Sequence, residues 1–375
     1  MSHIVRNSLA FALFLAVHPL GAQEPCCRSE ALEIAERYRV EGLDSRRFAH
    51  EQYWGALKPA LESERIGVTP LGASAEGRAI RAVTFGSGQT TVLMWSQMHG
   101  DESTATMALA DLLQWVADSP PDDELRSLLE ERLNVVLVPM LNPDGAERFR
   151  RENARGVDIN RDARRTATPE GRILKSLRDS IRAEFGFNLH DQGTHAAGEG
   201  GGLVAIALLA PAADEERSWG PVRQRARGVA AVIAAALEPE LSGRLARYDD
   251  GWAARAFGDN MQAWGTSTVL IESGVLAGDA QKQELRKLHV VGLLSALHAI
   301  ATGRVDTEPT AAYDDLPENR EIDVHLLVTG GHLVLPGAAP VRVDVAIRFD
   351  DSSARTGPRI AEVGDLSDAS AVDTV

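Results

Sequence analysis

The 375-residue chain is long enough to form one large α/β domain with a small appendage, and burying a sizeable core presents no difficulty. Its formal net charge of −15 comes without any basic cluster, which argues against nucleic acid and anionic membrane surfaces as partners. The two cysteines, Cys26 and Cys27, are adjacent, so they offer neither a useful disulfide nor a metal site made of thiolates. Any metal chemistry must therefore use histidine and carboxylate ligands.

The first 22 residues have the layout of a secretory signal peptide. Arg6 supplies a positive start, residues 9–17 are an apolar run, and Leu20, Gly21 and Ala22 resemble a cleavage site. The apolar run is too short for a comfortable transmembrane helix, although an uncleaved anchor is the alternative. We therefore expect a secreted or periplasmic protein without stable membrane insertion once residues 1–22 are removed.

Short apolar segments alternate with longer helical patterns through the next 270 residues or so, after a helical region at 31–61 with a polar break near Asp44. Strands are expected at residues 91–95, at 133–141, up to 187–189, within 201–210, and at 267–271. Helices are expected at residues 103–117, 171–184, 229–237 and 279–301. This alternation predicts an α/β fold, a mixed and mostly parallel twisted sheet covered by helices on both faces.

The last quarter of the chain has a different pattern of polar and apolar residues. The first domain is expected to span residues 31–303, followed by a polar, proline-containing linker at 304–320. Residues 321–364 contain strand-like alternation at 324–328, 332–335 and 341–347, which predicts a small β module that serves stability or docking. Residues 365–375 are expected to form a frayed acidic tail.

Polar residues follow each of the main apolar strands. His99 and Glu102 come after the first, and the turn at 142–145 and then residues 160–162 come after the second. His190 ends the third, and the fourth leads into Glu272. In open α/β sheets, ligands bind outside the carboxyl ends of the strands. These side chains are therefore expected to meet in one crevice.

Their chemistry suits a hydrolytic metal site. His99 and Glu102 are three residues apart at a strand-to-helix turn, and His190 completes a set of two histidines and one carboxylate. A zinc ion held by such a set keeps one position open for water, whose pKa it lowers. Glu272 is the candidate for a carboxylate that is not a ligand and takes the proton of that water. An isolated His-x-x-Glu is weak evidence, and the further groups at strand ends strengthen it.

The ordered set of motifs resembles the zinc carboxypeptidase (metallocarboxypeptidase) family over about residues 50–300. The motifs that carry the resemblance are His99-Gly100-Asp101-Glu102, Asn142-Pro143-Asp144-Gly145, Gly156-Val157-Asp158-Ile159-Asn160-Arg161, His190 and Glu272. The resemblance implies a zinc carboxypeptidase-like fold that binds one Zn²⁺ per chain through His99, Glu102 and His190. It also implies that Glu272 activates the zinc-bound water.

The resemblance implies further roles for residues that contact the substrate. Asn160 and Arg161 match the pair that binds the free carboxylate of the C-terminal residue, although Asp162 stands where the family usually has Asn. Arg151 is the best match to the arginine that stabilises the oxyanion of the scissile carbonyl, and Tyr248 to the tyrosine that closes over the substrate. Other arginines crowd the Arg151 segment, namely Arg148, Arg150 and Arg155.

The sequence thus predicts a metallocarboxypeptidase that hydrolyses the C-terminal bond of peptides or of peptidoglycan stem peptides. Two alternatives stay open: a zinc-dependent deacylase or amidase acting on N-acylated amino acids, and a catalytically silent peptide-binding domain. The silent domain is disfavoured because neither the base nor a ligand is missing. His195, close after His190, is interpreted as a loop residue lining the cleft rather than as a fourth ligand.

Overall fold

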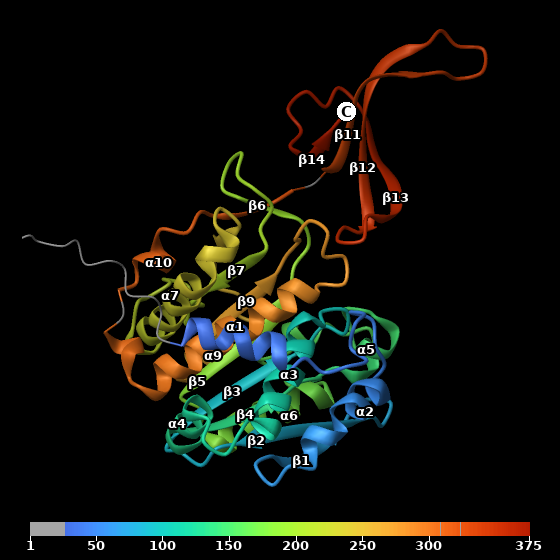
Figure 1. Cartoon of the computed structure of the whole chain (residues 1–375). Helices are drawn as coiled ribbons and strands as arrows, with labels where there is room; N and C mark the ends of the chain where they lie inside the picture. Colours follow the sequence, from blue (N-terminus) through green and yellow to red (C-terminus); the bar gives the residue numbers. More distant parts are fainter. Residues whose placement is uncertain (1–26, 308, 323) are drawn as a thin grey trace, which may run out of the picture.

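The computed structural model describes residues 27–307, 309–322 and 324–375 (Figure 1). The expected signal peptide, residues 1–22, lies outside the described residues. Within the described part of the chain, no helix is long and apolar enough to cross a membrane.

An eight-stranded mixed sheet forms the centre of the larger domain, with the strand order β1-β2-β4-β3-β5-β9-β7-β8. Its strands are β1 (Gly67–Ala73), β2 (Ala79–Phe85), β3 (Thr90–Ser96), β4 (Leu133–Val138), β5 (Phe185–Asp191), β7 (Ile206–Leu209), β8 (Leu245–Arg247) and β9 (Ser267–Ser273). The four central strands β4, β3, β5 and β9 run parallel, while β2 and β7 pair antiparallel with their inner neighbours. The predicted mixed, mostly parallel sheet is confirmed. The β1–β2 hairpin was not predicted, because β1 is largely exposed and its sequence, which includes Pro70 and two glycines, shows no alternation of apolar and polar residues.

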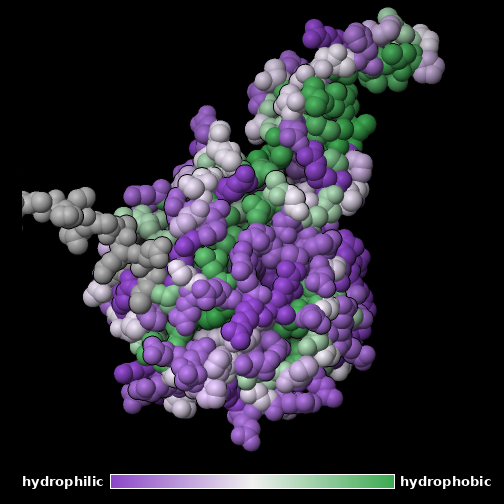
Figure 2. All heavy atoms as spheres, viewed as in Figure 1, coloured by the Kyte–Doolittle hydropathy of each residue, from purple (hydrophilic) through white to green (hydrophobic). Residues whose placement is uncertain are grey.

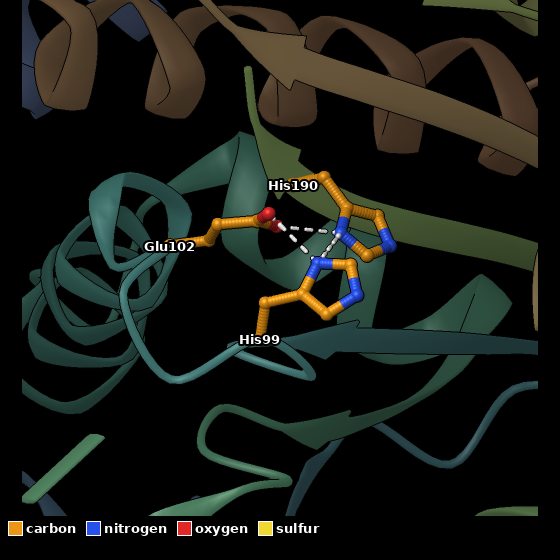
Figure 3. Close-up of side chains that lie close together, drawn as sticks. All are labelled: His99, Glu102 and His190. Carbon is orange, nitrogen blue, oxygen red and sulfur yellow. Dashed lines mark hydrogen bonds and ion pairs between the residues drawn. The ribbon is translucent and has the colours of Figure 1, made fainter. Parts of the chain in front are cut away.

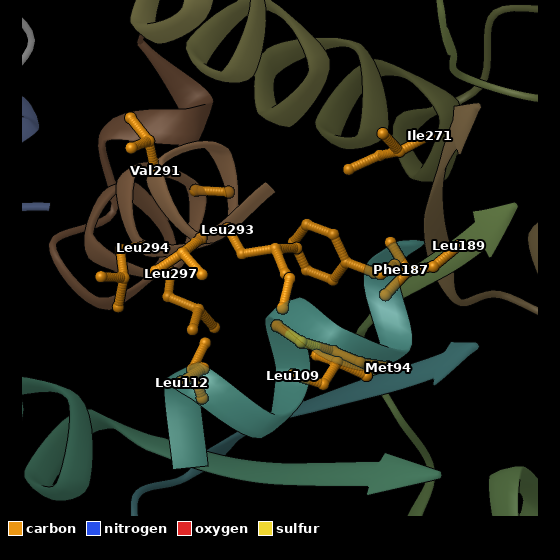
Figure 4. Close-up of a cluster of buried hydrophobic side chains, with 14 of the residues drawn as sticks. Met94, Leu109, Leu112, Phe187, Leu189, Ile271, Val291, Leu293, Leu294 and Leu297 are labelled. Carbon is orange, nitrogen blue, oxygen red and sulfur yellow. The ribbon is translucent and has the colours of Figure 1, made fainter. Parts of the chain in front are cut away.

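Helices cover both faces of this sheet. One face carries α1 (Arg28–Arg37), α2 (His50–Leu61), α3 (Thr104–Asp118), α4 (Glu124–Arg132), α7 (Pro221–Leu241) and α9 (Gln283–Ala301), and the other carries α6 (Pro169–Ile181) and α8 (Phe257–Ala263). Side chains along a strand alternate between faces. Met94 of β3 therefore joins the first cluster, with Phe187 and Leu109 (Figure 4). The next residue, Trp95, joins the second cluster. The two clusters fix the strands whose ends form the site.

The segment at 304–320, expected as a linker, packs against the larger domain. It contains the short helices η2 (Arg304–Asp306) and α10 (Ala311–Asp314), and Tyr313 is 2% exposed. The backbone N–H of Ala210 donates to the Tyr313 hydroxyl at 3.1 Å, and Asp314 forms an ion pair with Arg227. The segment is polar in composition, so the sequence did not indicate that Tyr313 is buried in the core. This side chain holds the segment in place.

The C-terminal module is a four-stranded sheet with the order β13-β12-β11-β14. Its strands are β11 (Val324–Leu333), β12 (Val341–Asp351), β13 (Thr356–Gly364) and β14 (Ala371–Thr374). The strands expected at residues 324–328 and 332–335 form a single strand, β11, which continues through a bulge. The bulge includes Gly330, whose φ of +65° suits glycine. The predicted frayed tail is wrong for residues 371–374, because β14 pairs in parallel with β11 and the Val375 N–H donates to the Leu327 carbonyl at 2.9 Å.

Candidate metal centre and substrate cleft

The turn between β3 and α3 carries the first two residues of the site. Gly100 lies so close to the first turn of α5 (Pro143–Arg148) that an added Cβ would stand 2.0 Å from the Gly145 carbonyl carbon. A glycine is therefore required, and the tight contact fixes His99 and Glu102 on either side of it. His190 lies on the neighbouring strand β5, so the two segments meet at the carboxyl ends of their strands.

His99, Glu102 and His190 converge on one point (Figure 3). The Nδ1 of His99 lies 2.7 Å from one carboxylate oxygen of Glu102, and the Nδ1 of His190 lies 2.6 Å from the other. All three residues are buried, with 2%, 8% and 3% of their surface exposed. Among the residues that the structure describes, they form the one group of at least three metal-ligating types whose ligand atoms gather within 4.8 Å.

This arrangement fits a zinc ion. The two Nδ1 atoms are 3.2 Å apart, close to the separation of about 3.3 Å expected for two nitrogens each about 2.0–2.1 Å from a tetrahedral zinc. Two imidazoles and one carboxylate are also the donor set of hydrolytic zinc sites with an open position. The buried residues therefore suit this metal in both chemistry and spacing.

Asp158 supports the centre from behind, a role that the sequence interpretation did not assign to it. Its carboxylate lies 3.0 Å from the Nε2 of His99, so the Nδ1 of that ring faces the cluster. The same carboxylate accepts two hydrogen bonds from Arg151, at 3.1 and 3.0 Å. Burial alone would raise the pKa of Asp158, but His99 and Arg151 hold this pKa well below its usual range. The sequence could have indicated this role of Asp158, because the residue lies within the Gly156–Arg161 motif.

Glu272 lies on β9, directly opposite His190 on β5. The residue is 9% exposed, and burial together with the nearby charge of Glu102 raises the pKa of its carboxyl group well above the usual value. A carboxylate with a raised pKa is a better proton acceptor than an ordinary surface one. The register of the two strands thus places a basic carboxylate beside the candidate metal centre.

All of the residues singled out from the sequence line one cleft of about 340 Å³. They are His99, Glu102, Arg151, Asn160, Arg161, His190, Tyr248 and Glu272. The cleft also contains His195, which lies outside the three-residue cluster, as expected. It is not in a loop, as the sequence suggested, but begins the short strand β6 (His195–Ala197). Of the four arginines between positions 148 and 155, Arg151 is the one that lines the cleft.

The remaining polar residues of the cleft differ in how firmly they are held. Two nitrogens of Arg151 bind Asp158, and the third, Nη1, lies 3.1 Å from the Nδ1 of His99. The side chain of Asn160 accepts a hydrogen bond from the backbone N–H of Phe257 at 2.8 Å. The guanidinium of Arg161 is exposed and donates to the backbone carbonyl of Asn160 at 2.7 Å. Arg161 is thus the cation of the cleft with the freest access to a ligand.

A buried ion pair behind the cleft was missed in the sequence. Lys282 is 2% exposed, and its Nζ donates to the Ser273 carbonyl at 2.9 Å and lies 3.4 Å from the Asp191 carboxylate. Asp191 also accepts a hydrogen bond from Thr104 at 2.7 Å. Lys282 therefore joins the ends of the strands that carry His190 and Glu272. Its backbone is left-handed, with φ of +55°, and the sequence gives no sign that this lysine is buried.

Comparison with known proteins agrees with this geometry. The sequence model of the zinc carboxypeptidase family matches residues 51–188. Carboxypeptidase SOL1 of Arabidopsis thaliana is 38% identical over 65 residues, which cover 17% of this chain and 13% of that protein. An uncharacterized protein of Zymomonas mobilis is 25% identical over 147 residues, which cover 38% of each chain. The matched segments thus span well under two thirds of both curated relatives.

Solved structures show the same fold. A metallo-carboxypeptidase from Burkholderia cenocepacia is similar with a TM-score of 0.55 at 19% identity, over 68% of this chain and 70% of that one. Carboxypeptidase A from Helicoverpa armigera is similar with a TM-score of 0.55 at 16% identity, over 73% and 81% of the two chains. At these identities the likeness concerns the fold.

Proposed function

We propose that this chain, whose residues 51–188 match the zinc carboxypeptidase family, is an exported zinc-dependent enzyme that removes C-terminal residues from peptides or peptidoglycan stem peptides. Export is proposed from the sequence of residues 1–22. The observation that carries the proposal is that one cleft holds both a zinc-type cluster and, at Asn160 and Arg161, groups suited to a free carboxylate.

His99, Glu102 and His190 are the residues that would hold the metal. When bound, a zinc ion lowers the pKa of a water molecule and polarises the scissile carbonyl group. Around it the chain supplies a largely buried pocket, which strengthens the electrostatic interactions inside the cleft.

Glu272 acts as the general base. Its carboxylate accepts a proton from the attacking water and later passes that proton to the nitrogen of the leaving residue. The raised pKa of this buried carboxyl group suits the first transfer, because the group takes up a proton more readily than an exposed glutamate. No other chain group needs to store the proton between the two steps.

Arg151 and Tyr248 act on the substrate without exchanging protons. Asp158 fixes two nitrogens of Arg151, so the remaining Nη1 points toward the cluster and can donate to the carbonyl oxygen as negative charge develops there. Burial and the charge of Glu272 raise the pKa of Tyr248 to about 12. Its hydroxyl therefore stays protonated at neutral pH and can donate a hydrogen bond to the bound peptide.

Asn160 and Arg161 bind the C-terminal carboxylate. A planar guanidinium can grip a carboxylate with two charge-assisted hydrogen bonds, which are stronger than neutral ones. Arg161 is exposed to the cleft and free to make them, while Asn160 is held in place through Phe257. A substrate without that charge would leave the guanidinium unpaired.

The test compares kcat/KM for one peptide as its free acid and as its C-terminal amide. In the wild type, we expect the amide to react about 10²–10⁴ times more slowly, because the Arg161 guanidinium loses its charged carboxylate partner. Arg161→Ala should lower the rate on the acid and abolish most of this discrimination. Arg155→Ala is the matched control, since Arg155 is exposed and does not line the cleft. Equal wild-type rates on acid and amide would reject the carboxypeptidase function in favour of an amidase or endopeptidase.

A further inference from the structure

The β module is fastened to the α/β domain at two places beside the cleft. Strand β10 (Asn319–Glu321), which leads into the module, pairs antiparallel with β6 (His195–Ala197) and sets Glu321 opposite His195. Where β12 ends, Asp351 forms an ion pair with Arg46, and both side chains are largely buried, at 12% and 11% exposed. These two anchors hold the lower end of the module against the domain (Figure 1).

The space between the anchors begins at the cleft. A cavity of about 290 Å³ is lined by both parts of the chain, and it shares Gly193, His195 and Glu321 with the cleft. Its module side includes Arg348, Asp350 and Arg359, so its surface is polar and carries both signs of charge. The cleft therefore does not end at β6 and β10 but opens into a second space.

A third, more apolar cavity follows. It has a volume of about 220 Å³ and shares Thr194, His325, Phe349 and Ser352 with the polar cavity. The rings of Phe349 and His325 lie parallel, with an interplanar angle of 4° and centroids 5.8 Å apart. The aliphatic side chains around them come from both parts of the chain, namely Leu203, Val275, Leu276 and Val372.

We propose that the two cavities continue the cleft as a binding groove for the upstream residues of a peptide substrate, with an apolar or aromatic side chain of the peptide packed against Phe349. The proposal rests on the carboxypeptidase function. A peptide whose last carboxylate is held at Arg161 and whose scissile bond lies at the metal centre must send its preceding residues out of the cleft. The residues shared between cleft and cavities provide a continuous path for them.

The chemistry of the groove suits a peptide. Backbone amides and polar side chains can pair with the mixed charges of the first cavity, and one apolar side chain can leave water in the second. Burying one such side chain favours binding by roughly tenfold or more. A peptide too short to reach Phe349 gains nothing from the module, so the groove makes cleavage depend on substrate length.

The experiment uses the full-length, zinc-loaded protein and two peptides with the same C-terminal residues. One is an N-acetylated dipeptide, and the other is a hexapeptide with phenylalanine and leucine among its first four residues. We expect the wild-type kcat/KM to be about tenfold higher for the hexapeptide. Phe349→Ala should remove this gain and leave the rate on the dipeptide unchanged.

Two further variants separate the groove from a general loss of the module. Leu203→Asp places a charge in the apolar cavity from the α/β side, and it should also remove the gain. Val334→Ala changes an apolar residue of the same module that is 67% exposed and outside both cavities, and it should keep the gain. A gain that persists in both Phe349→Ala and Leu203→Asp, or equal wild-type rates on the two peptides, would overturn the proposal.

Equilibrium binding separates failure of the groove from failure of the proposed function. In Glu272→Gln protein, the hexapeptide should bind about tenfold more tightly than the dipeptide, and adding Phe349→Ala should remove the difference. Tighter hexapeptide binding that depends on Phe349, in a wild type that cleaves neither peptide, would support the groove and reject the carboxypeptidase function. Equal binding of the two peptides would reject the groove whatever the turnover.

Discussion

The α/β domain and the β module differ most in how much apolar surface they bury. The domain packs a large cluster on one face of its sheet and a second cluster on the other, and its visible surface is mostly hydrophilic (Figure 2). The module has four buried apolar residues, Val324, Leu327, Ala346 and Leu366, and it exposes apolar side chains on its long β11–β12 hairpin. Val334 and Val341 of that hairpin are 67% and 57% exposed.

This difference explains where the chemistry lies. Burying a charged group costs several kcal/mol unless it is paired and hydrogen-bonded, and only a large core around the group can hold its partners in place. The domain buries Glu102 and Lys282 together with such partners, and it pairs the partly exposed Asp158 with Arg151. The module buries no comparable cluster among its described residues. It can add to the function only at its edge, where it meets the cleft.

The largest expected effect is a loss of turnover, and it comes from a substitution in the α/β domain. Glu272→Gln should lower kcat by about 10²–10⁴, because the amide cannot accept the proton of the attacking water. Zinc content and melting temperature should change little, since the amide has nearly the same shape and removes a buried carboxylate of raised pKa. Kinetics on the free-acid peptide and metal analysis measure both quantities. A variant that keeps nearly wild-type kcat would show that the base lies elsewhere.

Matched core truncations test whether the two regions are separate units. Leu109→Ala, at a site 0% exposed in the large cluster, should cost about 4 kcal/mol in the free energy of unfolding of the domain. Leu327→Ala, in the small cluster of the module, should cost about 2 kcal/mol, because its surroundings can collapse more easily.

Calorimetry distinguishes the outcomes of these truncations. Leu327→Ala should leave the main unfolding transition of the α/β domain in place, while Leu109→Ala should lower its temperature. If both variants shift one common transition, then the module and the domain unfold together and the comparison fails.

A smaller effect, on the pH dependence of stability, is expected from His289, which lies on α9 behind the cleft. Its Nε2 is 2.6 Å from the Ser273 hydroxyl, with Asp191 and Lys282 nearby, and burial lowers the pKa of His289 to about 4. Between this value and the ordinary pKa of about 6.5, the unfolded chain binds more protons than the folded protein. The contribution of His289 to stability is therefore complete above pH 6.5 and is lost as the pH falls toward 4.

The change that isolates this contribution is His289→Gln, which keeps a side chain able to bond Ser273. The free energy of unfolding of the wild type should fall more steeply with decreasing pH than that of the variant, by at most about 1.4 kcal/mol per pH unit. Groups that titrate in both proteins cancel in the difference. Denaturant titrations at several pH values from 7 to 4 measure it, and a difference that does not change with pH would contradict the assignment.

Much of the site was predictable because its residues follow apolar strands. A run such as residues 91–95 or 267–271 predicts a buried strand from its own composition, and a parallel sheet brings the residues after such strands to one edge. This reasoning gathered His99, Glu102, His190 and Glu272 in one cleft, where the structure places them.

Contacts between distant segments were not predictable in this way. Lys282 turns inward through a left-handed backbone, and Tyr313 is an isolated aromatic residue in a polar segment, so neither carries a periodic signal. The pairing of β14 with β11 depends on an exposed strand edge that only the folded module offers. Local patterns therefore predicted the four central strands β3, β4, β5 and β9, but not which outlying segments pack on them.

The central claim is tested most directly by mass spectrometry of a defined peptide mixture after incubation with the zinc-loaded protein. The mixture contains free-acid peptides and N-acylated amino acids, with a parallel sample treated with a metal chelator. We predict the loss of single residues from the C-termini of the peptides, abolished by the chelator and restored by zinc. Internal cuts or the release of acyl groups, with peptide C-termini left intact, would contradict the assignment of this cleft to a carboxypeptidase.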